Sequence, residues 1–258
     1  MIEELLPPGV TSSEAFDDAA PAPLFPAEAA LMEGRRARRR RQFATARACA
    51  RRCLAQLGRR PGPPQPGAGG GPPGPAPRAP PPPRRPRPPP APPRPRPPGP
   101  RRPVPLLPGP GGAPQWPTGV VGSITHCDGY RGAVAARSSS VSALGIDAEP
   151  AGPLPKGVLN LITSAEERTH LTALTTADPS LPWDRIFFSA KEAAYKAWYP
   201  ATGIWLGFRD ATLALSPDGT FTTTLHPPTP TPVNPVYEGR WLAGPDLVLT
   251  AVARSAGR

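Results

Sequence analysis

The clearest pattern of apolar and polar positions lies between residues 181 and 199. Apolar residues recur there at steps of three and four, as on one face of an amphipathic helix. They are Ile186, Phe187, Ala190, Ala194, Ala197 and Trp198. Pro182 suits a first helical turn, where a missing N–H costs nothing, and Pro200 and Gly203 end the helix. We predict that the chain is organised around this helix.

Three charged residues, Lys191, Glu192 and Lys196, fall outside the apolar face. Glu192 and Lys196 are four apart and are therefore neighbours on the helix surface. Alone they would indicate an exposed ion pair. The upstream stretch Gly145-Ile-Asp-Ala-Glu149 changes that interpretation, because it holds two further carboxylates.

Apolar runs and alternating patterns predict strands elsewhere. The expected strands cover residues 119–126, 132–136, 141–149, 211–215, 220–225, 238–243 and 247–253. Two further helices are expected, at 26–57 with a break at Gly34 and at 163–174 behind a Ser/Thr–Glu capping box. Residues 1–25 indicate a loop with one short helix. These elements mix without a βαβ rhythm, so we predict an α+β fold.

Composition changes this picture at one segment. The 258 residues include 46 prolines and carry a formal net charge of +11, but residues 61–103 hold 23 prolines, eight arginines and no acidic residue. Such a stretch lacks the backbone donors and apolar side chains of a core, so we predict a disordered, polyproline-II-leaning insert. Its PxxP spacings suit an aromatic groove and its charge suits nucleic acid. A tolerated loop insertion, costing ~1–2 kcal/mol in closure entropy, is the favoured interpretation.

The first residues and the cysteines bear on location. Residues 1–8 are acidic and short, unlike a signal peptide, and no run approaches the ~20 apolar residues that span a bilayer. Three cysteines do not make a disulfide framework, and with His126 they lack the paired spacing of a zinc site. We expect a cytoplasmic protein that does not span a membrane.

The candidate chemistry rests on carboxylates. Asp147 and Glu149 lie two apart at a strand end, so both side chains point to one face, where they repel unless a cation joins them. Mg²⁺ suits such a hard oxygen site, and Glu192 would supply a third carboxylate. Lys191 and Lys196 beside it would meet phosphate oxygens. The expected chemistry is a magnesium-assisted displacement at phosphorus.

Three motifs occur in order: Gly122-Ser-Ile-Thr-His126, Gly145-Ile-Asp-Ala-Glu149 and Phe188-Ser-Ala-Lys-Glu-Ala-Ala-Tyr-Lys196. Together they closely resemble the surfactin-type (group II) 4′-phosphopantetheinyl transferases, and most of all the actinobacterial branch of that family. The similarity runs over residues 1–60 and 104–255. Shorter matches lie at 47–51, 112–117 and 125–131.

The resemblance implies two similar α+β subdomains in a pseudo-twofold arrangement. The first would combine residues 1–60 with 104–143, the second would cover 144–258, and the disordered insert 61–103 would interrupt the first. Coenzyme A would bind in the cleft between them. The implied activity transfers phosphopantetheine from coenzyme A to a serine of an apo acyl or peptidyl carrier protein.

The resemblance also implies residue roles. Asp147 and Glu149 would hold Mg²⁺, with the carbonyl of Ala148 near the ion and Asp147 also near coenzyme A. Glu192 would help to ligate the metal and take the proton from the carrier serine. That serine attacks the β-phosphate and releases 3′,5′-ADP. Contacts to the phosphates of coenzyme A would come from Arg39, Arg47, Thr125, His126, Lys191 and Lys196. Lys191 and Lys196 would neutralise charge on the pyrophosphate, and Lys196 would be catalytic together with Glu192.

The chain departs from the family at residues 108–112. The family usually carries one or two basic residues here, whereas this sequence reads Pro-Gly-Pro-Gly-Gly. Coenzyme A then binds more weakly, or an insert arginine such as Arg101 or Arg102 substitutes. The sequence leaves both outcomes open.

Two other functions compete with this one. The first is a magnesium-dependent phosphodiesterase or nuclease that uses the same carboxylates with water as nucleophile. The second is a non-enzymatic Arg/Pro-rich module that binds nucleic acid with steep salt dependence. We favour the transferase, acting on carriers of fatty-acid, polyketide, peptide or siderophore synthesis. We expect a monomer, since one chain supplies both half-sites, and no nucleic-acid partner.

Overall fold

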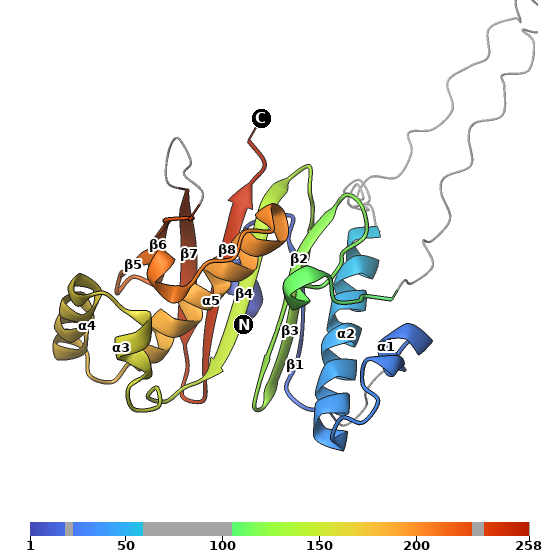
Figure 1. Cartoon of the computed structure of the whole chain (residues 1–258), viewed down its shortest axis with the longest axis horizontal. Coiled ribbons are helices and arrows are strands. Elements are labelled where there is room, and N and C mark those ends of the chain that lie inside the picture. Colours follow the sequence, from blue (N-terminus) through green and yellow to red (C-terminus); the bar gives the residue numbers. More distant parts are fainter. Residues whose placement is uncertain (19–22, 59–104, 229–234, 258) are drawn as a thin grey trace, which may run out of the picture.

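The computed structural model describes residues 1–18, 23–58, 105–228 and 235–257. Two antiparallel sheets lie next to each other, and each is packed against one long helix (Figure 1). The expected α+β class is confirmed. The predicted disordered insert, residues 61–103, falls outside the described residues.

The N-terminal sheet has the strand order β1-β3-β2. Its elements are the 3-10 helix η1 (Ile2–Leu5), β1 (Thr11–Ala15), α1 (Pro26–Ala30), α2 (Ala37–Gly58), β2 (Val120–Cys127) and β3 (Tyr130–Arg137). Helix α2 packs Cys49, Ala50 and Cys53 against Ala133 and Ala135 of β3, and all five are buried.

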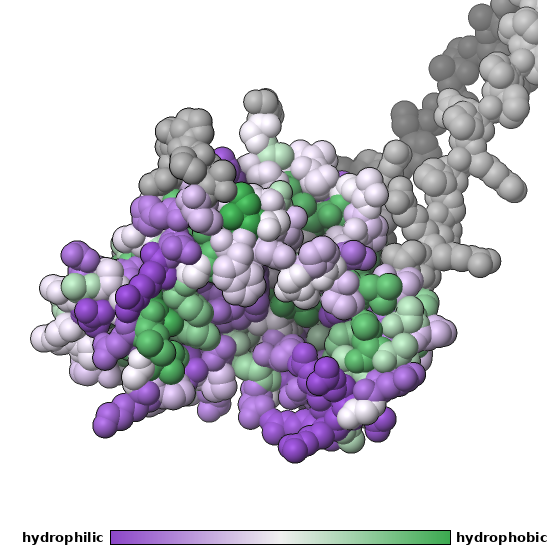
Figure 2. Space-filling model, in the orientation of Figure 1, coloured by the Kyte–Doolittle hydropathy of each residue, from purple (hydrophilic) through white to green (hydrophobic). Residues whose placement is uncertain are grey.

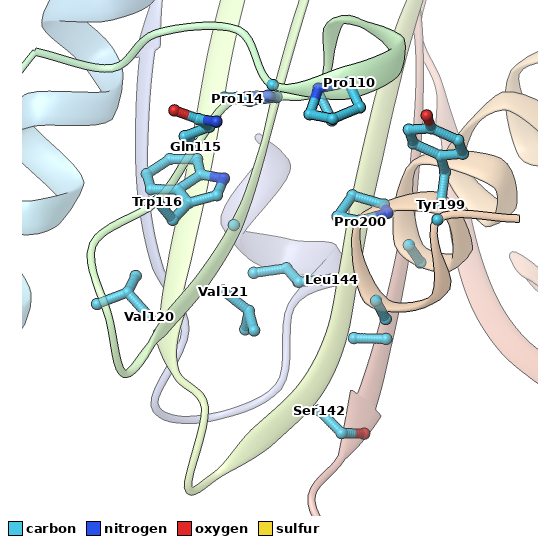
Figure 3. Close-up of a pocket in the computed structure, with 17 residues that line it drawn as sticks. Pro110, Pro114, Gln115, Trp116, Val120, Val121, Ser142, Leu144, Tyr199 and Pro200 are labelled. Carbon is cyan, nitrogen blue, oxygen red and sulfur yellow. The ribbon is translucent and has the colours of Figure 1, made fainter.

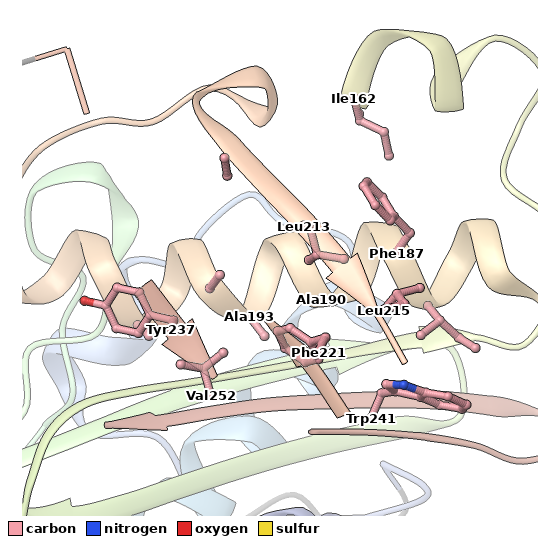
Figure 4. Packing of buried hydrophobic residues seen from close by; sticks show 14 of the residues in the cluster. Ile162, Phe187, Ala190, Ala193, Leu213, Leu215, Phe221, Tyr237, Trp241 and Val252 are labelled. Atoms are coloured by element: carbon pink, nitrogen blue, oxygen red, sulfur yellow. The ribbon is translucent and has the colours of Figure 1, made fainter. Parts of the chain in front are cut away.

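The C-terminal sheet has the order β4-β8-β7-β6-β5. Its strands are β4 (Val141–Pro150), β5 (Ala211–Leu215), β6 (Thr220–Leu225), β7 (Val236–Ala243) and β8 (Leu247–Ser255). Helix α5 (Trp183–Thr202) covers it, with α3 (Val158–Ile162), α4 (Ala165–Ala177) and the 3-10 helix η3 (Phe208–Asp210) beside it. Phe187 of α5 lies near Leu213, Phe221 and Trp241 of the sheet in one buried cluster (Figure 4). The expected apolar face of this helix is confirmed.

The two sheets meet at β2 and β4, which are neighbours without forming a strand ladder. Two hydroxyl groups of β2 take the place of the ladder bonds. Ile146 donates its N–H to Ser123 Oγ, and Ala148 donates its N–H to Thr125 Oγ1, both at 3.1 Å. Thr125 is thereby held between the sheets, beside the carboxylate of Asp147.

Gly145 lets α5 approach β4 closely. A Cβ at this position would lie 2.0 Å from the carbonyl oxygen of Ala193 and 2.6 Å from the amide nitrogen of Ala197. A Gly145→Ala variant should therefore push the helix off the strand and cost about 1–3 kcal/mol in the free energy of unfolding. Chemical denaturation measures this loss, with Gly58→Ala as the control because its added Cβ meets no atom within 4 Å. Equal stability of the two variants would contradict the close packing.

Several boundaries differ from the sequence predictions. Strand β1 and helix α3 were not expected, and Pro200 lies inside α5, which ends at Gly203 with a left-handed φ of 69°. The expected break at Gly34 is confirmed by its φ of 69°. Strand β4 begins at Val141, slightly before the proposed subdomain boundary at residue 144, and that division stays a prediction. Within the ranges that the structure describes, no helix is both long and apolar enough to cross a membrane.

Candidate active site

The site forms where the end of β4 faces the middle of α5. Asp147 is 4% exposed and accepts hydrogen bonds on both carboxylate oxygens. Lys196 Nζ donates to Oδ1 at 2.6 Å and Ser189 Oγ donates to Oδ2 at 2.9 Å. Thr125 Oγ1 donates to Oδ1 at 3.2 Å. One carboxylate thus joins β2, β4 and α5.

Glu149 reaches the same helix through a residue that the sequence analysis missed. Arg185 Nη1 donates to Glu149 Oε2 at 2.9 Å. The same guanidinium donates to the carbonyls of Gly152 and Pro153, at 2.9 and 2.7 Å. Burial and the charge of Asp147 raise the pKa of Glu149, and Arg185 opposes that shift. The expectation that Asp147 and Glu149 point to one face is confirmed, because both contact α5.

Glu192 is half-buried and makes no hydrogen bond or ion pair with any residue that the structure describes. Burial raises its pKa, and the charges of Asp147 and Glu149 raise it further against the opposing charge of Lys196. The three carboxylates are therefore close enough to repel one another. Lys196 and Arg185 are the cations that offset them.

Lys191 was expected at the pyrophosphate, and the structure corrects this assignment. Its ammonium is buried and forms an ion pair with Glu167 at 3.0 Å. It also donates to the carbonyls of Ile162, Phe208 and Ala211, each at 2.8 Å. Successive residues of an α-helix are rotated by about 100°, so Lys191 points away from the face that carries Glu192 and Lys196. Lys191 joins α3, α4, η3 and β5 and has no donor left for a phosphate.

Arg39 and His126 meet at the rim of the site. Arg39 Nη1 lies 2.7 Å from His126 Nε2, which must accept because a guanidinium can only donate. Desolvation, followed by the charges of Arg39, Lys196 and Arg131, lowers the pKa of His126 to about 4. The imidazole is exposed at the rim, next to these three cations. A rim this positive attracts anions.

Arg47 lies deeper than Arg39. It is 7% exposed, its Nε donates to the carbonyl of Leu106 at 2.8 Å, and its guanidinium stacks 4.3 Å from the centre of the Phe43 ring. Burial lowers its pKa to about 10, so Arg47 stays charged at neutral pH. The expected placement of Arg47 directly against phosphates stays a prediction.

Exposed arginines surround the start of α2. Figure 2 shows a strongly hydrophilic surface over this end of the helix. It contains Arg35, Arg36, Arg38, Arg39, Arg40 and Arg41. Arg38 forms an ion pair with Asp128. This surface and the pair Arg39–His126 make one side of the site basic.

The oxygen atoms of this site bear on whether it can hold a metal ion. Among the described residues, no group of three or more His, Cys, Asp or Glu side chains is gathered for a metal. Lys196 and Arg185 form ion pairs with two of the carboxylates. Free oxygens nevertheless remain: Glu149 Oε1 and both oxygens of Glu192 accept no hydrogen bond from these residues. Ala148 donates its N–H to Thr125 Oγ1 of β2. Because the N–H and C=O of a strand residue point to the same side, the carbonyl of Ala148 also faces β2. These hard oxygen donors fit Mg²⁺ once Lys196 releases Asp147.

Comparisons with known proteins identify the family of this chain. Residues 143–243 match the model of the 4′-phosphopantetheinyl transferase superfamily, and residues 100–136 match that of the 4′-phosphopantetheinyl transferase N-terminal domain. The 4′-phosphopantetheinyl transferase Svp of Streptomyces mobaraensis is 43% identical over 263 residues, covering 99% of this chain and 90% of the relative.

Two further relatives extend the comparison. The 4′-phosphopantetheinyl transferase Npt of Nocardia iowensis is 37% identical, covering 98% of this chain and 99% of the relative. The 4′-phosphopantetheinyl transferase PptT of Mycobacterium tuberculosis is 38% identical, covering 94% and 95%. The matches span nearly the whole of both chains and include the strands and the helix that form the site. This protein therefore belongs to the 4′-phosphopantetheinyl transferase superfamily.

Proposed function

We propose that this enzyme transfers the phosphopantetheine arm of coenzyme A to a serine of an apo acyl or peptidyl carrier protein, with Mg²⁺ and with release of 3′,5′-ADP. As a 4′-phosphopantetheinyl transferase it modifies carrier proteins. The observation that carries the finer proposal is the convergence of Asp147 and Glu149 with Glu192 and Lys196 beside a basic rim. Three carboxylates beside the basic rim that contains Arg39 suit a site that receives a metal ion and a pyrophosphate together.

Asp147, Glu149, Glu192 and the carbonyl of Ala148 are the proposed metal ligands. A bound Mg²⁺ supplies charge neutralisation at the pyrophosphate. Arg185 holds one oxygen of Glu149 and leaves the other open, while Ser189 fixes one oxygen of Asp147. These two residues orient the carboxylates without occupying every lone pair.

Glu192 is the proposed general base for the carrier serine. Its carboxylate is half-buried and accepts no hydrogen bond from the described residues, so an incoming hydroxyl can donate to it. The elevated pKa brings it closer to neutrality, where proton transfer is more effective. The serine oxygen then attacks the β-phosphate of coenzyme A.

The nucleotide phosphates are proposed to bind on the basic side of the cleft. Lys196 exchanges Asp147 for a phosphate oxygen, and Thr125, His126 and Arg39 line the route toward α2. Arg47 is close enough to Arg39 for their charges to interact, and it adds to the positive potential. Since each of these residues belongs to one chain, a monomer is sufficient for the reaction.

The proposal is tested by incubating the protein with coenzyme A, Mg²⁺ and an apo carrier protein. Mass spectrometry should show one phosphopantetheine arm on a single serine, and chelation of the metal should stop the reaction. Transfer without metal would overturn the proposed metal site. Hydrolysis of coenzyme A or nucleic acid by water, with no carrier modification, would favour the phosphodiesterase or nuclease instead.

Arg185 provides a separate prediction. An Arg185→Met variant should bind Mn²⁺ about 10–100-fold more weakly, because partners that orient metal ligands typically contribute this much. Calorimetric titration with Mn²⁺ gives this readout independently of turnover. Asp184→Asn is the matched control, since Asp184 holds the same loop through the N–H of Leu154 without touching Glu149. Tighter Mn²⁺ binding in Arg185→Met would instead identify Arg185 as a competitor for Glu149.

A further inference from the structure

Strand β8 carries one hydroxyl group between two valines on its buried face. Val248, Thr250 and Val252 alternate along the strand, so their side chains share a face, and all three are fully buried. The two valines pack in the apolar cluster that contains α5. Burying a hydroxyl costs free energy unless it makes hydrogen bonds, so Thr250 needs partners that a valine at this position would not.

Both partners of Thr250 belong to Ser189 of α5. Thr250 Oγ1 donates to the carbonyl of Ser189 at 2.9 Å and also lies 2.9 Å from Ser189 Oγ. Ser189 Oγ in turn donates to Asp147 Oδ2 at 2.9 Å. Asp147 and Thr250 are opposite each other in the pairing of β4 with β8. The three side chains therefore form a buried polar row that crosses from β8 through α5 to β4.

The number of hydrogens gives this row a direction. Each hydroxyl group has one hydrogen to donate, and a carboxylate oxygen only accepts. The hydrogen of Ser189 goes to Asp147, so Ser189 has none left for β8. The hydrogen of Thr250 then points to Ser189, where the carbonyl and Oγ both lie within hydrogen-bond distance. Asp147 is the acceptor at the end of the row.

Ser189 has another possible acceptor in its own helix. A serine inside a helix can donate to the carbonyl four residues earlier, which here belongs to Arg185. Thr250 offers Ser189 Oγ a donor on the side that faces the sheet, and so favours the orientation in which Ser189 donates to Asp147. Thr250 thus acts on Asp147 through Ser189, without contacting the reacting atoms.

A neighbouring cavity does not reach this row. It has a volume of about 440 Å³ and lies beside the C-terminal end of α5 and the first residues of β4, where Figure 3 shows Tyr199, Pro200 and Leu144. Asp147, Ser189 and Thr250 do not line it. Water that enters this cavity cannot replace a hydroxyl removed from the row, so the remaining partner loses its hydrogen bond.

We propose that Thr250 is a positioning residue for Asp147 and that it acts through the hydroxyl of Ser189. The inference rests on the proposed function, in which Asp147 is a metal ligand and Lys196 leaves its Oδ1 for a phosphate. Once Lys196 has left, Ser189 still holds Oδ2 and fixes the direction in which Oδ1 points. Partners of this kind orient metal ligands and thereby raise metal affinity.

The test titrates the full-length protein with Mn²⁺ in a calorimeter, after thermal melts have shown that each variant is folded. Thr250→Val keeps the shape of the side chain but removes the hydroxyl, and should bind Mn²⁺ about tenfold more weakly. Thr250→Ser keeps the hydroxyl and loses a methyl group, so it should be less stable and yet bind Mn²⁺ like the wild type. The reverse order of affinities would attribute the effect to packing and overturn the proposal.

Thr223→Val is the matched control. Thr223 is fully buried on β6 of the same sheet, and its hydroxyl has no hydrogen-bond partner among the described residues. The same chemical change there should leave the Mn²⁺ affinity unaltered. An equal loss of affinity in Thr223→Val and Thr250→Val would show a general effect of the substitution and contradict a specific role of Thr250.

A double variant tests whether Thr250 acts through Ser189. Ser189→Ala should weaken Mn²⁺ binding by about 10–100-fold, and adding Thr250→Val should weaken it little further, because the route to Asp147 is already lost. Losses that multiply would show that Thr250 acts independently of Ser189. In transfer assays, saturating Mg²⁺ should restore the rate of Thr250→Val, whereas a loss that Mg²⁺ does not restore would contradict a role in positioning a metal ligand.

The wild-type titration separates this proposal from the proposed function. A wild-type protein that does not bind Mn²⁺ would overturn the metal site itself, and the role of Thr250 with it. If the wild type binds Mn²⁺ and both Ser189→Ala and Thr250→Val bind it equally well, only the positioning role is overturned.

Discussion

A Glu192→Gln variant is expected to lose transfer by about 10²–10⁴-fold and to keep its affinity for 3′,5′-ADP. The amide keeps the shape of the side chain but cannot accept the serine proton as a carboxylate does. It also removes one of the three negative charges that face one another at this site. Nucleotide binding should persist, because Arg39, His126 and Lys196 are unchanged.

The measurement compares initial rates of carrier modification with nucleotide affinity from calorimetry. Glu238→Gln is the matched control, since Glu238 is exposed on β7, in the part of the C-terminal sheet away from β4. A Glu192→Gln enzyme that works near the wild-type rate would remove this residue from the mechanism. Equal losses of rate and of nucleotide affinity would assign Glu192 to substrate binding.

The carboxylate side of the site was predictable because local rules determine it. Asp147 and Glu149 are two apart on a strand, and Glu192 and Lys196 are four apart on a helix, so each pair shares a face. Which strand would meet which helix did not follow from these spacings. The resemblance to a known family supplied that pairing, and contacts of α5 with β4 confirm it.

Lys191 was assigned to the pyrophosphate because of its charge, without regard to its angular position on the helix. Arg185, Ser189, Glu192 and Lys196 follow one another at steps of four, three and four, which is a polar stripe along α5. All four face the end of β4. Lys191 falls outside this stripe, and the same count would have included Arg185 and Ser189.

Other features that the sequence did not predict include a strand that depends on contacts between distant parts of the chain. Strand β1 is short and polar, and it forms by pairing with β3, more than a hundred residues away. Thr11 Oγ1 donates to the carbonyls of Cys53 and Ala135, neither of which is near it in the sequence. Pro200 lies inside α5, in an exposed last turn that continues to Thr202 before Gly203 ends the helix.

Replacing Lys191 is expected to reduce stability, whereas replacing Lys196 is expected to reduce affinity for coenzyme A. Lys191→Met would leave Glu167 charged, buried and without its cation, which typically costs 3–5 kcal/mol. Lys196 is more exposed, and its partner Asp147 would keep hydrogen bonds from Ser189 and Thr125. Lys196→Met should therefore raise the KM for coenzyme A with a smaller change in the free energy of unfolding.

A double variant distinguishes the structural role of Lys191 from a role in binding. Glu167→Gln in the Lys191→Met background removes the uncompensated charge. The free energy of unfolding of the double variant should therefore be at least about 1 kcal/mol higher than that of Lys191→Met alone. Recovery should be incomplete, because Lys191 also caps three carbonyls and Glu167 accepts from the N–H groups of Ser164 and Leu213. Well below its melting temperature, Lys191→Met should keep a KM for coenzyme A close to that of the wild type. A large rise in this KM with unchanged stability would return Lys191 to the pyrophosphate, because a lysine held by Glu167 and three carbonyls cannot also bind the substrate.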